Sequence, residues 1–531
     1  MYIRSFLGCL ITGVLLALSW PTYGFPALLF IAFVPLLYVV WQLKAHRFHK
    51  SVVFGLSFLA FFIWNIATVG WLIKLPIGYV VWFATIVNAL LMALIFLLYH
   101  VVSRKTNFSL ATLFLVCLWL SFEYLHLHWE FSFPWLNLGN GFAAFTSWIQ
   151  WYEYTGAFGG TLWVWLVNIG IFKAVLLYLE HKDKKILYKA ALVNMLIILI
   201  PIGISLLILK LYEEKGTAVE VVILQPNVDP YSEKYDVPNS SIAKSLQRLV
   251  DSTATKNTRF IIAPETVFAE KTRLKKFKYG SAKRGVTEMI EYYPQASFLG
   301  GVDMWDPFKD PSKASKQTNL IRDGFYVDDY NSAFFVRQDG THELYHKTKL
   351  VVGAEHFPYK NLLKPILGDA MLDLGGTVLQ KTTQEDREVF YTNDDIGVGP
   401  IICYESIYGE FVTGYVRNGA NFLAIITNDG WWGNTQGHKQ HLSFAKLRAI
   451  ETRRDIARSA NTGISAIINQ KGELVQQLGY EQGGTLKGNV QLNNQMTFYV
   501  RFGNYIPRIA IFLGILVLLY VFTRRRGEVG K

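Results

Sequence analysis

Cysteine is scarce in this chain. Only Cys9, Cys117 and Cys403 occur among 531 residues. Cys9 and Cys117 lie in apolar segments of the membrane-spanning type, whereas Cys403 lies in a mixed stretch typical of a globular domain. Because an apolar span and a globular domain hold their cysteines apart, we expect no intramolecular disulfide. The sequence therefore predicts that Cys403 is a free thiol.

The signatures of several common enzyme classes are absent from the sequence. The chain has no Gly-x-Ser-x-Gly pattern and no Walker A loop, which argues against a serine esterase and against an ATP-driven machine. His438 and His441 have a spacing that metal ligands use, but no cysteine or second histidine pair completes a site. We therefore expect a surface helix at these histidines, no metal and no cofactor.

Charged residues are also few, at 17%, whereas 51% of the chain is hydrophobic, which favours a membrane protein. The formal net charge is +12. Much of the basic excess falls in short loops between apolar stretches, so it indicates membrane topology and predicts no nucleic-acid partner. The basic run at residues 271–284 is interpreted as a solvated face, or alternatively as a surface that rests on anionic lipid head groups.

Eight apolar stretches have nearly the length of about 20 residues that a helix needs to cross a bilayer. They lie at residues 6–22, 24–43, 52–73, 79–101, 108–126, 160–180, 188–211 and 503–523. If eight spans alternate, these basic residues fall on one side: Arg4, Lys44, Arg47, Lys50, Arg104, Lys105, Lys182, Lys184, Lys185, Arg524, Arg525 and Arg526. By the positive-inside rule that side is the cytoplasm, so we expect both termini there and residues 213–500 outside.

The sequence thus predicts three parts. Residues 1–212 form a membrane domain of seven transmembrane helices, and within it the aromatic-rich segment 127–159 is expected at the membrane interface, as an anchor or as a lipid-binding element. Residues 213–500 form an extracytoplasmic α/β domain. Residues 501–531 form the eighth transmembrane helix and a basic cytoplasmic tail.

Strand and helix patterns alternate in the region 213–500, which is typical of a layered α/β domain. Strands are expected at residues 219–224, 259–263, 297–302, 396–403 and 422–427. A hairpin is expected at residues 332–337 and 342–345, and another about Lys471-Gly472. Helices are expected at residues 239–255, 283–293, 406–418 and 438–456.

Three polar residues follow strand-like runs, where functional groups of layered α/β domains gather. They are Glu265, Lys347 and Cys403. A helix beginning at Ser406 would favour the thiolate of Cys403 through its dipole. Together the three groups could perform acyl transfer, because a carboxylate can remove the thiol proton and an ammonium can stabilise the oxyanion.

These residues and their neighbours resemble the Glu-Lys-Cys triad of the nitrilase, or carbon–nitrogen hydrolase, superfamily. Its membrane-bound apolipoprotein N-acyltransferase branch is the most similar. The motifs that carry the resemblance are Pro264-Glu265-Thr266, Tyr345-His346-Lys347, Ile402-Cys403-Tyr404-Glu405, Phe133-Pro134-Trp135-Leu136-Asn137-Leu138-Gly139, Tyr330-Asn331-Ser332 and Asn428-Asp429-Gly430-Trp431-Trp432-Gly433. The similarity covers nearly the whole chain, including the number of spans.

The resemblance implies that Glu265 is the general base, Lys347 stabilises the oxyanion and Cys403 is the nucleophile. It implies supporting roles for Glu355, Glu405, Tyr404 and Asn331. It implies substrate or lipid binding by Trp135, Asn428, Trp431 and Trp432. A structural ion pair with Lys347 or an arginine is the alternative role for Glu355 and Glu405.

The resemblance further implies an eight-helix membrane bundle with an αββα nitrilase-like domain, in a bacterial inner membrane with that domain in the periplasm. Cys403 would take an acyl chain from a phospholipid and pass it, by a ping-pong mechanism, to the N-terminal S-diacylglyceryl cysteine of apolipoproteins. The protein would meet membrane lipids and act as a monomer. Two alternatives stay open: a membrane-tethered amidase with water as the acceptor, and a transporter or scaffold with a decayed domain.

The sequence departs from the family pattern in two places. Ala263 stands where a tryptophan usually precedes Pro-Glu. Val352-Gly353-Ala354 stands where Pro-Phe-Gly is usual, before Glu355. Both departures leave the triad intact, but they affect the expected shape of the loops around it.

Overall fold

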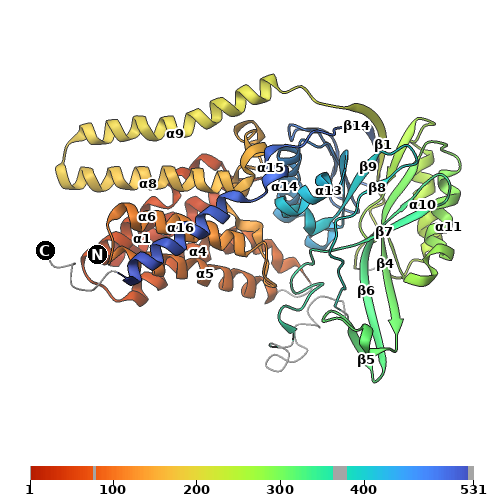
Figure 1. Ribbon diagram of the computed structural model, residues 1–531, viewed down its shortest axis with the longest axis horizontal. Helices are drawn as coiled ribbons and strands as arrows, with labels where there is room; N and C mark the ends of the chain where they lie inside the picture. Colours follow the sequence, from red (N-terminus) through yellow and green to blue (C-terminus); the bar gives the residue numbers. More distant parts are fainter. Residues whose placement is uncertain (1, 76–78, 232, 361, 363–379, 524–531) are drawn as a thin grey trace. The chain divides into compact units, whose positions relative to one another are not determined.

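The computed structural model describes residues 2–75, 79–231, 233–360, 362 and 380–523. The chain forms two compact units (Figure 1). The helical unit contains most of the chain up to Tyr212 and the residues from Phe502 onward, and the α/β unit contains Glu213–Arg501. The Val352-Gly353-Ala354 loop and the triad lie within the described residues of the α/β unit.

Apolar helices make up the helical unit. They are α1 (Tyr2–Leu18), α2 (Leu29–Ala32), α3 (Val34–Ala45), α4 (Lys50–Val69), α5 (Tyr79–Ser103), α6 (Phe108–Leu125), α8 (Ala157–His181), α9 (Lys184–Leu211) and α16 (Tyr505–Thr523). Within the described residues, seven helical segments are long and apolar enough to cross a membrane, and α1 is a further apolar helix of 17 residues. The predicted membrane bundle of about eight helices is confirmed.

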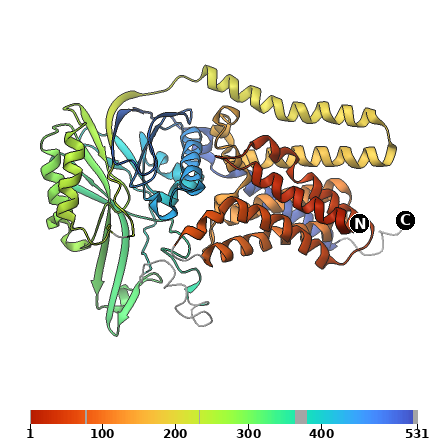
Figure 2. The same cartoon turned by 180° about the vertical axis from the view of Figure 1, so that it is seen from behind.

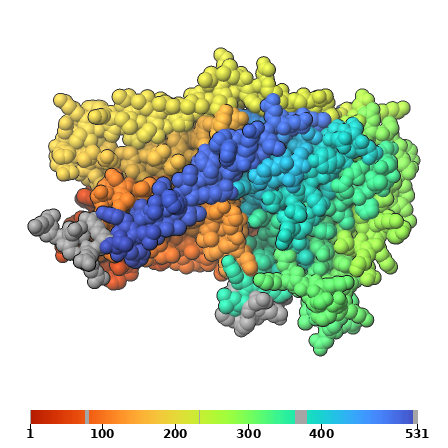
Figure 3. Space-filling view, in the orientation of Figure 1, coloured from red at the N-terminus to blue at the C-terminus, as the bar shows by residue number. Residues whose placement is uncertain are grey.

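The helical unit exposes apolar side chains on its outer helices. α16 packs on α6 and lies on the outside of the unit, as the space-filling view in Figure 3 shows. Its Phe512 and Phe522 are 62% and 78% exposed. A helix that is apolar on its outward face as well as its packed face is suited to contact lipid.

The aromatic segment 127–159 is packed more deeply than the sequence indicated. It forms the short helices η3 (Pro134–Leu136), η4 (Leu138–Phe142), η5 (Thr146–Trp148) and α7 (Tyr152–Thr155). The buried carboxylate of Glu123 accepts hydrogen bonds from Leu138 N at 2.8 Å and from Thr161 Oγ1 at 2.7 Å. Trp135 is only 1% exposed. The middle of the segment is therefore held inside the helical unit by a polar anchor and is not spread along its surface.

Two β-sheets form the centre of the α/β unit. The first has the order β14-β1-β2-β4-β6-β5, with β3 paired to β4 and β7 to β6, and the second has the order β13-β12-β11-β10-β9-β8. The strands of the first sheet are β1 (Thr217–Gln225), β2 (Thr258–Ile262), β3 (Phe268–Arg273), β4 (Ser297–Phe308), β5 (Asn319–Arg322), β6 (Phe325–Val336), β7 (His342–His346) and β14 (Gly484–Leu492). Those of the second are β8 (Phe390–Tyr391), β9 (Gly397–Ile402), β10 (Phe422–Thr427), β11 (Ile456–Ala460), β12 (Ser465–Ile468) and β13 (Leu474–Leu478).

The α/β unit has four layers. The sheets meet face to face, since the rings of Phe260 in β2 and Phe422 in β10 lie 4.8 Å apart. Helices α10 (Asn239–Asp251) and α11 (Ser281–Ile290) cover the outer face of the first sheet, which Figures 1 and 2 show from opposite sides. Helices α13 (Gly409–Arg417) and α14 (Gln436–Thr452) pack on each other and form the layer next to the second sheet. The predicted αββα fold is confirmed.

One predicted helix begins later than expected. The sequence predicted a helix at 406–418 directly after the cysteine, but the 3₁₀ turn η8 (Cys403–Ile407) follows β9 and α13 begins only at Gly409. Tyr408 has an extended backbone, with φ −95° and ψ 92°, which separates the two elements. The Glu405 carboxylate reaches back to the backbone N–H of Ile402 at 2.8 Å and closes the turn.

Candidate active site

Three strand ends bring the predicted triad together. Glu265 follows β2, Lys347 follows β7 and Cys403 follows β9. The first two strands belong to one sheet and the third to the other, so the site lies where the ends of both sheets meet. All three residues are buried, with exposed fractions of 6%, 1% and 7%. Each of the three residues follows the end of its strand, and the strand ends bring the three side chains into one site.

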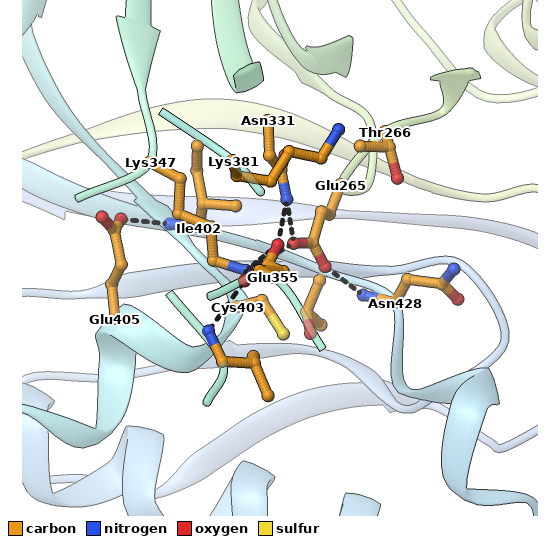
Figure 4. Close-up of polar contacts among 12 residues, drawn as sticks. Glu265, Thr266, Asn331, Lys347, Glu355, Lys381, Ile402, Cys403, Glu405 and Asn428 are labelled. Atoms are coloured by element: carbon orange, nitrogen blue, oxygen red, sulfur yellow. Dashed lines mark hydrogen bonds and ion pairs between the residues drawn. The ribbon is translucent and has the colours of Figure 1, made fainter. Parts of the chain in front are cut away.

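Lys347 is the centre of an ion cluster, shown in Figure 4. Its Nζ lies 2.9 Å from Glu265 Oε1 and 2.9 Å from Glu355 Oε2. Asn331 Nδ2 donates to both carboxylates, at 2.8 Å to Glu265 and 2.9 Å to Glu355. Its own carbonyl accepts from Lys347 N at 2.8 Å. Asn331 on β6 therefore holds both carboxylates through its side chain and the backbone of Lys347 through its carbonyl.

Glu265 is ionised in this environment. Burial by itself raises the pKa of its carboxyl, but the charges of Lys347 and Lys234 and the hydrogen bonds from Lys347 and Asn331 outweigh that effect and lower the pKa. Its second oxygen, Oε2, accepts from the backbone N–H of Asn428 at 3.1 Å. A carboxylate held on both oxygens is well placed to receive a proton from a neighbour.

Cys403 lies in a strained turn beside this cluster. Its φ is +50°, in the left-handed region that residues with a side chain seldom adopt. Burial raises the pKa of its thiol, the charge of Glu265 raises it further, and the charge of Lys347 opposes both. The helix that was expected to favour the thiolate does not directly follow Cys403. A protonated thiol next to a carboxylate and an ammonium needs that carboxylate as its base.

A buried polar network holds the cysteine turn from behind. The Cys403 carbonyl accepts from Ser406 Oγ at 2.7 Å and lies 3.2 Å from His441 Nε2. His441 Nδ1 lies 3.0 Å from Asp429 Oδ1, and Asp429 Oδ2 pairs with Arg458 Nη2 at 2.6 Å. The expectation that these histidines lie on a surface helix is wrong, because α14 is buried and His441 is 1% exposed.

Glu405 has a different role from Glu355. Its Oε1 accepts from Tyr345 Oη at 2.6 Å and from Thr348 N at 2.7 Å, and its Oε2 accepts from Ile402 N. It thus joins the segment after β7 to the cysteine turn. Glu355 instead forms the ion pair with Lys347 that was the alternative prediction for both acids.

The unusual loop before Glu355 is a tight turn. Gly353 has a φ of +83°, which explains why glycine stands there. The backbone N–H of Val351 donates to Glu355 Oε2 at 2.9 Å, and Glu355 N donates to the carbonyl of Val351, also at 2.9 Å. This chain therefore positions Glu355 without the usual proline. Ala263, the other departure, is fully buried at the end of β2.

The remaining predicted residues are divided between the two units. Tyr404 is buried and its ring lies 5.5 Å from Tyr408. Asn428, Trp431 and Trp432 follow β10, and of these Asn428 contacts the triad directly. Trp432 packs on His441 with ring centroids 5.7 Å apart. Trp135 belongs to the helical unit, where its ring lies 5.2 Å from that of Trp71.

The sequence reasoning missed Lys234. This lysine is 5% exposed and donates a short hydrogen bond to the hydroxyl of Thr266, the residue after the base. It lies in the segment that follows the carboxyl end of β1. That position could have indicated Lys234, because Glu265, Lys347 and Cys403 were predicted from strand ends in the same way.

Sequence models of two families match this chain. The one described as the apolipoprotein N-acyltransferase N-terminal domain matches residues 12–170, and the one described as carbon-nitrogen hydrolase matches residues 315–496. The second match contains Lys347, Glu355 and Cys403. The two therefore fall in order along the chain, one in each unit.

Similar proteins cover nearly all of the chain. The apolipoprotein N-acyltransferases of Chlorobaculum tepidum and Thermotoga maritima are each 26% identical to it, over 97% and 98% of this chain and 96% and 93% of their own. A solved Saccharomyces cerevisiae member of branch 10 of the nitrilase superfamily has a TM-score of 0.36 and 13% identity, covering 53% of this chain and 92% of that one. With both domain models matched in order and relatives along nearly its whole length, the chain is similar in both of its units to the apolipoprotein N-acyltransferases, a family of enzymes.

Proposed function

We propose that this protein N-acylates lipoproteins, taking an acyl chain from a phospholipid and passing it to the α-amino group of an N-terminal S-diacylglyceryl cysteine. The observation that carries the proposal is the buried thiol of Cys403 beside an ionised Glu265 and the ammonium of Lys347. The names of the relatives supply the acceptor, an apolipoprotein.

In the first half-reaction Glu265 takes the proton of the Cys403 thiol. The thiolate attacks the ester carbonyl of the phospholipid, and the Lys347 ammonium stabilises the oxyanion that forms. When the ester C–O bond breaks, Glu265 returns the proton to the leaving alkoxide. The products are a thioester on Cys403 and a lysophospholipid.

In the second half-reaction the acceptor amine attacks the thioester. Glu265 takes a proton from the amine nitrogen, the C–S bond breaks, and the proton then returns to the Cys403 thiolate. One base thus serves both steps, because each moves a single proton between the nucleophile and the leaving group. The exchange is a ping-pong reaction in which donor and acceptor occupy the same site in turn.

The proposal includes an arrangement in the membrane. Residues 1–212 and 501–531 would span a bacterial inner membrane with both termini in the cytoplasm, and the catalytic domain 213–500 would lie in the periplasm. The long apolar helices and the basic loops between them support this arrangement. A phospholipid donor and a lipid-modified acceptor are both anchored in the bilayer, which gives a monomeric enzyme of this class a reason to be anchored as well.

Intact-protein mass spectrometry tests the proposal. After incubation with a phospholipid of one defined acyl chain, we expect wild type to gain one acyl mass that hydroxylamine removes, and Cys403→Ala to gain none. Cys117→Ala, which removes a buried thiol of the helical unit, is the matched control and should still be acylated. An adduct that persists in Cys403→Ala would overturn the nucleophile assignment. Release of free fatty acid with no transfer to a diacylglyceryl peptide would favour the amidase alternative.

A further inference from the structure

Lys234 is a second buried cation next to the triad. It lies in the chain that follows β1 and is 5% exposed. Its ammonium donates to Thr266 Oγ1 and lies 5.7 Å from the centre of the Trp431 ring. Thr266 directly follows the general base Glu265 and has a φ of +43°. In this conformation the Thr266 hydroxyl accepts the hydrogen bond from Lys234.

The neighbouring acids already have cations of their own. Lys381 Nζ lies 2.6 Å from Asp303 Oδ1 and 3.0 Å from Asp329 Oδ2, and the exposed Lys271 also pairs with Asp329 at 3.1 Å. Among the described residues, the ammonium of Lys234 has no carboxylate within ion-pair distance. Its one hydrogen bond there goes to the neutral hydroxyl of Thr266. Its charge is therefore not needed to neutralise the Asp303 and Asp329 pair.

The acids of the catalytic cluster outnumber its lysine, and Lys234 is a second positive charge near them. Glu265 and Glu355 are the two acids, and Lys347 contacts both of them. One lysine leaves such a cluster one negative charge in excess, and Lys234 supplies the missing positive charge. The groups that act electrostatically on Lys234 are Glu265, Asp303, Cys403 and Lys381, so its field reaches both the base and the nucleophile.

We propose that Lys234 is the counter-ion of the negative charge that travels through the site during acyl transfer. This inference rests on the proposed role of Cys403 as nucleophile. At rest the travelling charge is on Glu265. When the thiol proton moves to Glu265 the charge is on the sulfur, and when the S–C bond forms the carbonyl electron pair carries it to the acyl oxygen. Lys347 contacts the moving charge directly, but Glu355 offsets its positive charge, so the net balancing charge comes from Lys234.

The lowered pKa of Lys234 agrees with such a role. Burial lowers the pKa of its ammonium to about 8, against the opposing charges of Glu265 and Asp303. A buried cation without an ion pair is costly for folding. A cost of this kind is common at catalytic sites, where charged groups are placed for the reaction and not for stability.

Alkylation of Cys403 by iodoacetamide tests the role without any lipid. The probe reports how readily the thiol loses its proton, because only the thiolate attacks it. Removing a nearby cation raises the pKa of the coupled acid and thiol by at least about one unit, so Lys234→Met should be alkylated about tenfold more slowly at pH 7, with its rate profile shifted to higher pH. Lys234→Gln, which can still hydrogen-bond Thr266, should behave in the same way, and Lys234→Arg should stay close to wild type.

Matched controls separate charge from structure. Lys276→Met removes an exposed lysine of the same unit, and iodoacetamide should alkylate its Cys403 at the wild-type rate. Thermal unfolding of each variant shows whether it is folded. An unshifted pH profile in a folded Lys234→Met or Lys234→Gln would overturn the proposal, and so would an Arg variant as slow as the neutral ones. If alkylation responds as expected but phospholipid leaves no acyl adduct, the donor assignment fails and the role of Lys234 stands.

Discussion

At the scale of single residues, the decisive feature is that Cys403 is protonated and Glu265 is ionised in the resting site. Exchange of Glu265 for glutamine keeps the size and most hydrogen bonds of the side chain but removes the base. General bases contribute about a hundredfold to ten-thousandfold, so Glu265→Gln should slow the appearance of the acyl adduct by that factor.

The measurement is the rate of Cys403 acylation by mass spectrometry. Glu288→Gln, an exposed glutamate on α11, is the matched control and should acylate at the wild-type rate. Acylation of Glu265→Gln within threefold of wild type would remove Glu265 from the reaction and leave Glu355 as the remaining acid at Lys347.

The sequence predicted the triad because each of its members follows a strand-like run, a purely local pattern. It could not predict the surroundings in the same way. His441 contacts the cysteine turn from 38 residues away, and Lys234 reaches Thr266 from 32 residues away. The helix that carries His441 has polar residues on every face, which is typical of an exposed helix. Only the long-range partners bury it.

At the scale of elements, the pair of Asp429 and Arg458 ties β10 to β11 behind the nucleophile. Both side chains are fully buried and lie 2.6 Å apart. Burial alone raises the pKa of Asp429, but the charges of Arg458 and His441 outweigh it and hold that pKa well below its usual range. Because breaking a buried pair leaves one charge without a partner, we expect Asp429→Asn to lower the free energy of unfolding by about 3–5 kcal/mol.

The sign of the pH dependence follows from the lowered pKa. The contribution of Asp429 is fully present above its unfolded pKa, near 3.9, and is lost as the pH falls towards the folded value. Thermal unfolding of the detergent-solubilised protein should therefore show a wild-type advantage that is constant from pH 5 upward and shrinks in stronger acid. Asp394→Asn, at the exposed pair with Arg259, is the control and should change little. A difference that grows in acid would contradict this role.

The element boundaries show where local patterns stop being informative. The strand at 422–427 is present as predicted, since every residue in it is buried and apolar except its last. The helix predicted at 406–418 begins only at Gly409, because the polar side chains of its expected first turn bond to the backbone around Cys403 instead. Those bonds hold a residue with positive φ, which is a functional requirement that helix propensity does not register.

At the scale of the whole molecule, the side of the membrane on which the α/β unit lies depends on very few helices. α9 begins at Lys184, within the basic stretch Lys182–Lys185, and ends just before that unit. It has 28 residues, about 42 Å of helix, which is enough to cross a bilayer. The short helix α1 decides only the side of the N-terminus. The positive-inside rule for the 182–185 loop therefore predicts that the α/β unit lies outside, on whichever side α1 leaves the N-terminus.

Cysteine labelling tests this topology. In a background without Cys9, Cys117 and Cys403, a membrane-impermeant maleimide should label Lys313→Cys in intact spheroplasts, because this exposed residue lies in the α/β unit. Lys184→Cys, exposed at the start of α9, should be labelled only after the membrane is opened. The reverse pattern would put the α/β unit in the cytoplasm, and labelling of both sites from outside would mean that α9 does not cross. The first result would require the periplasmic location to be abandoned, and the second would overturn only the assignment of α9 as a transmembrane helix. The chemistry assigned to Cys403 would stand on its own test in both cases.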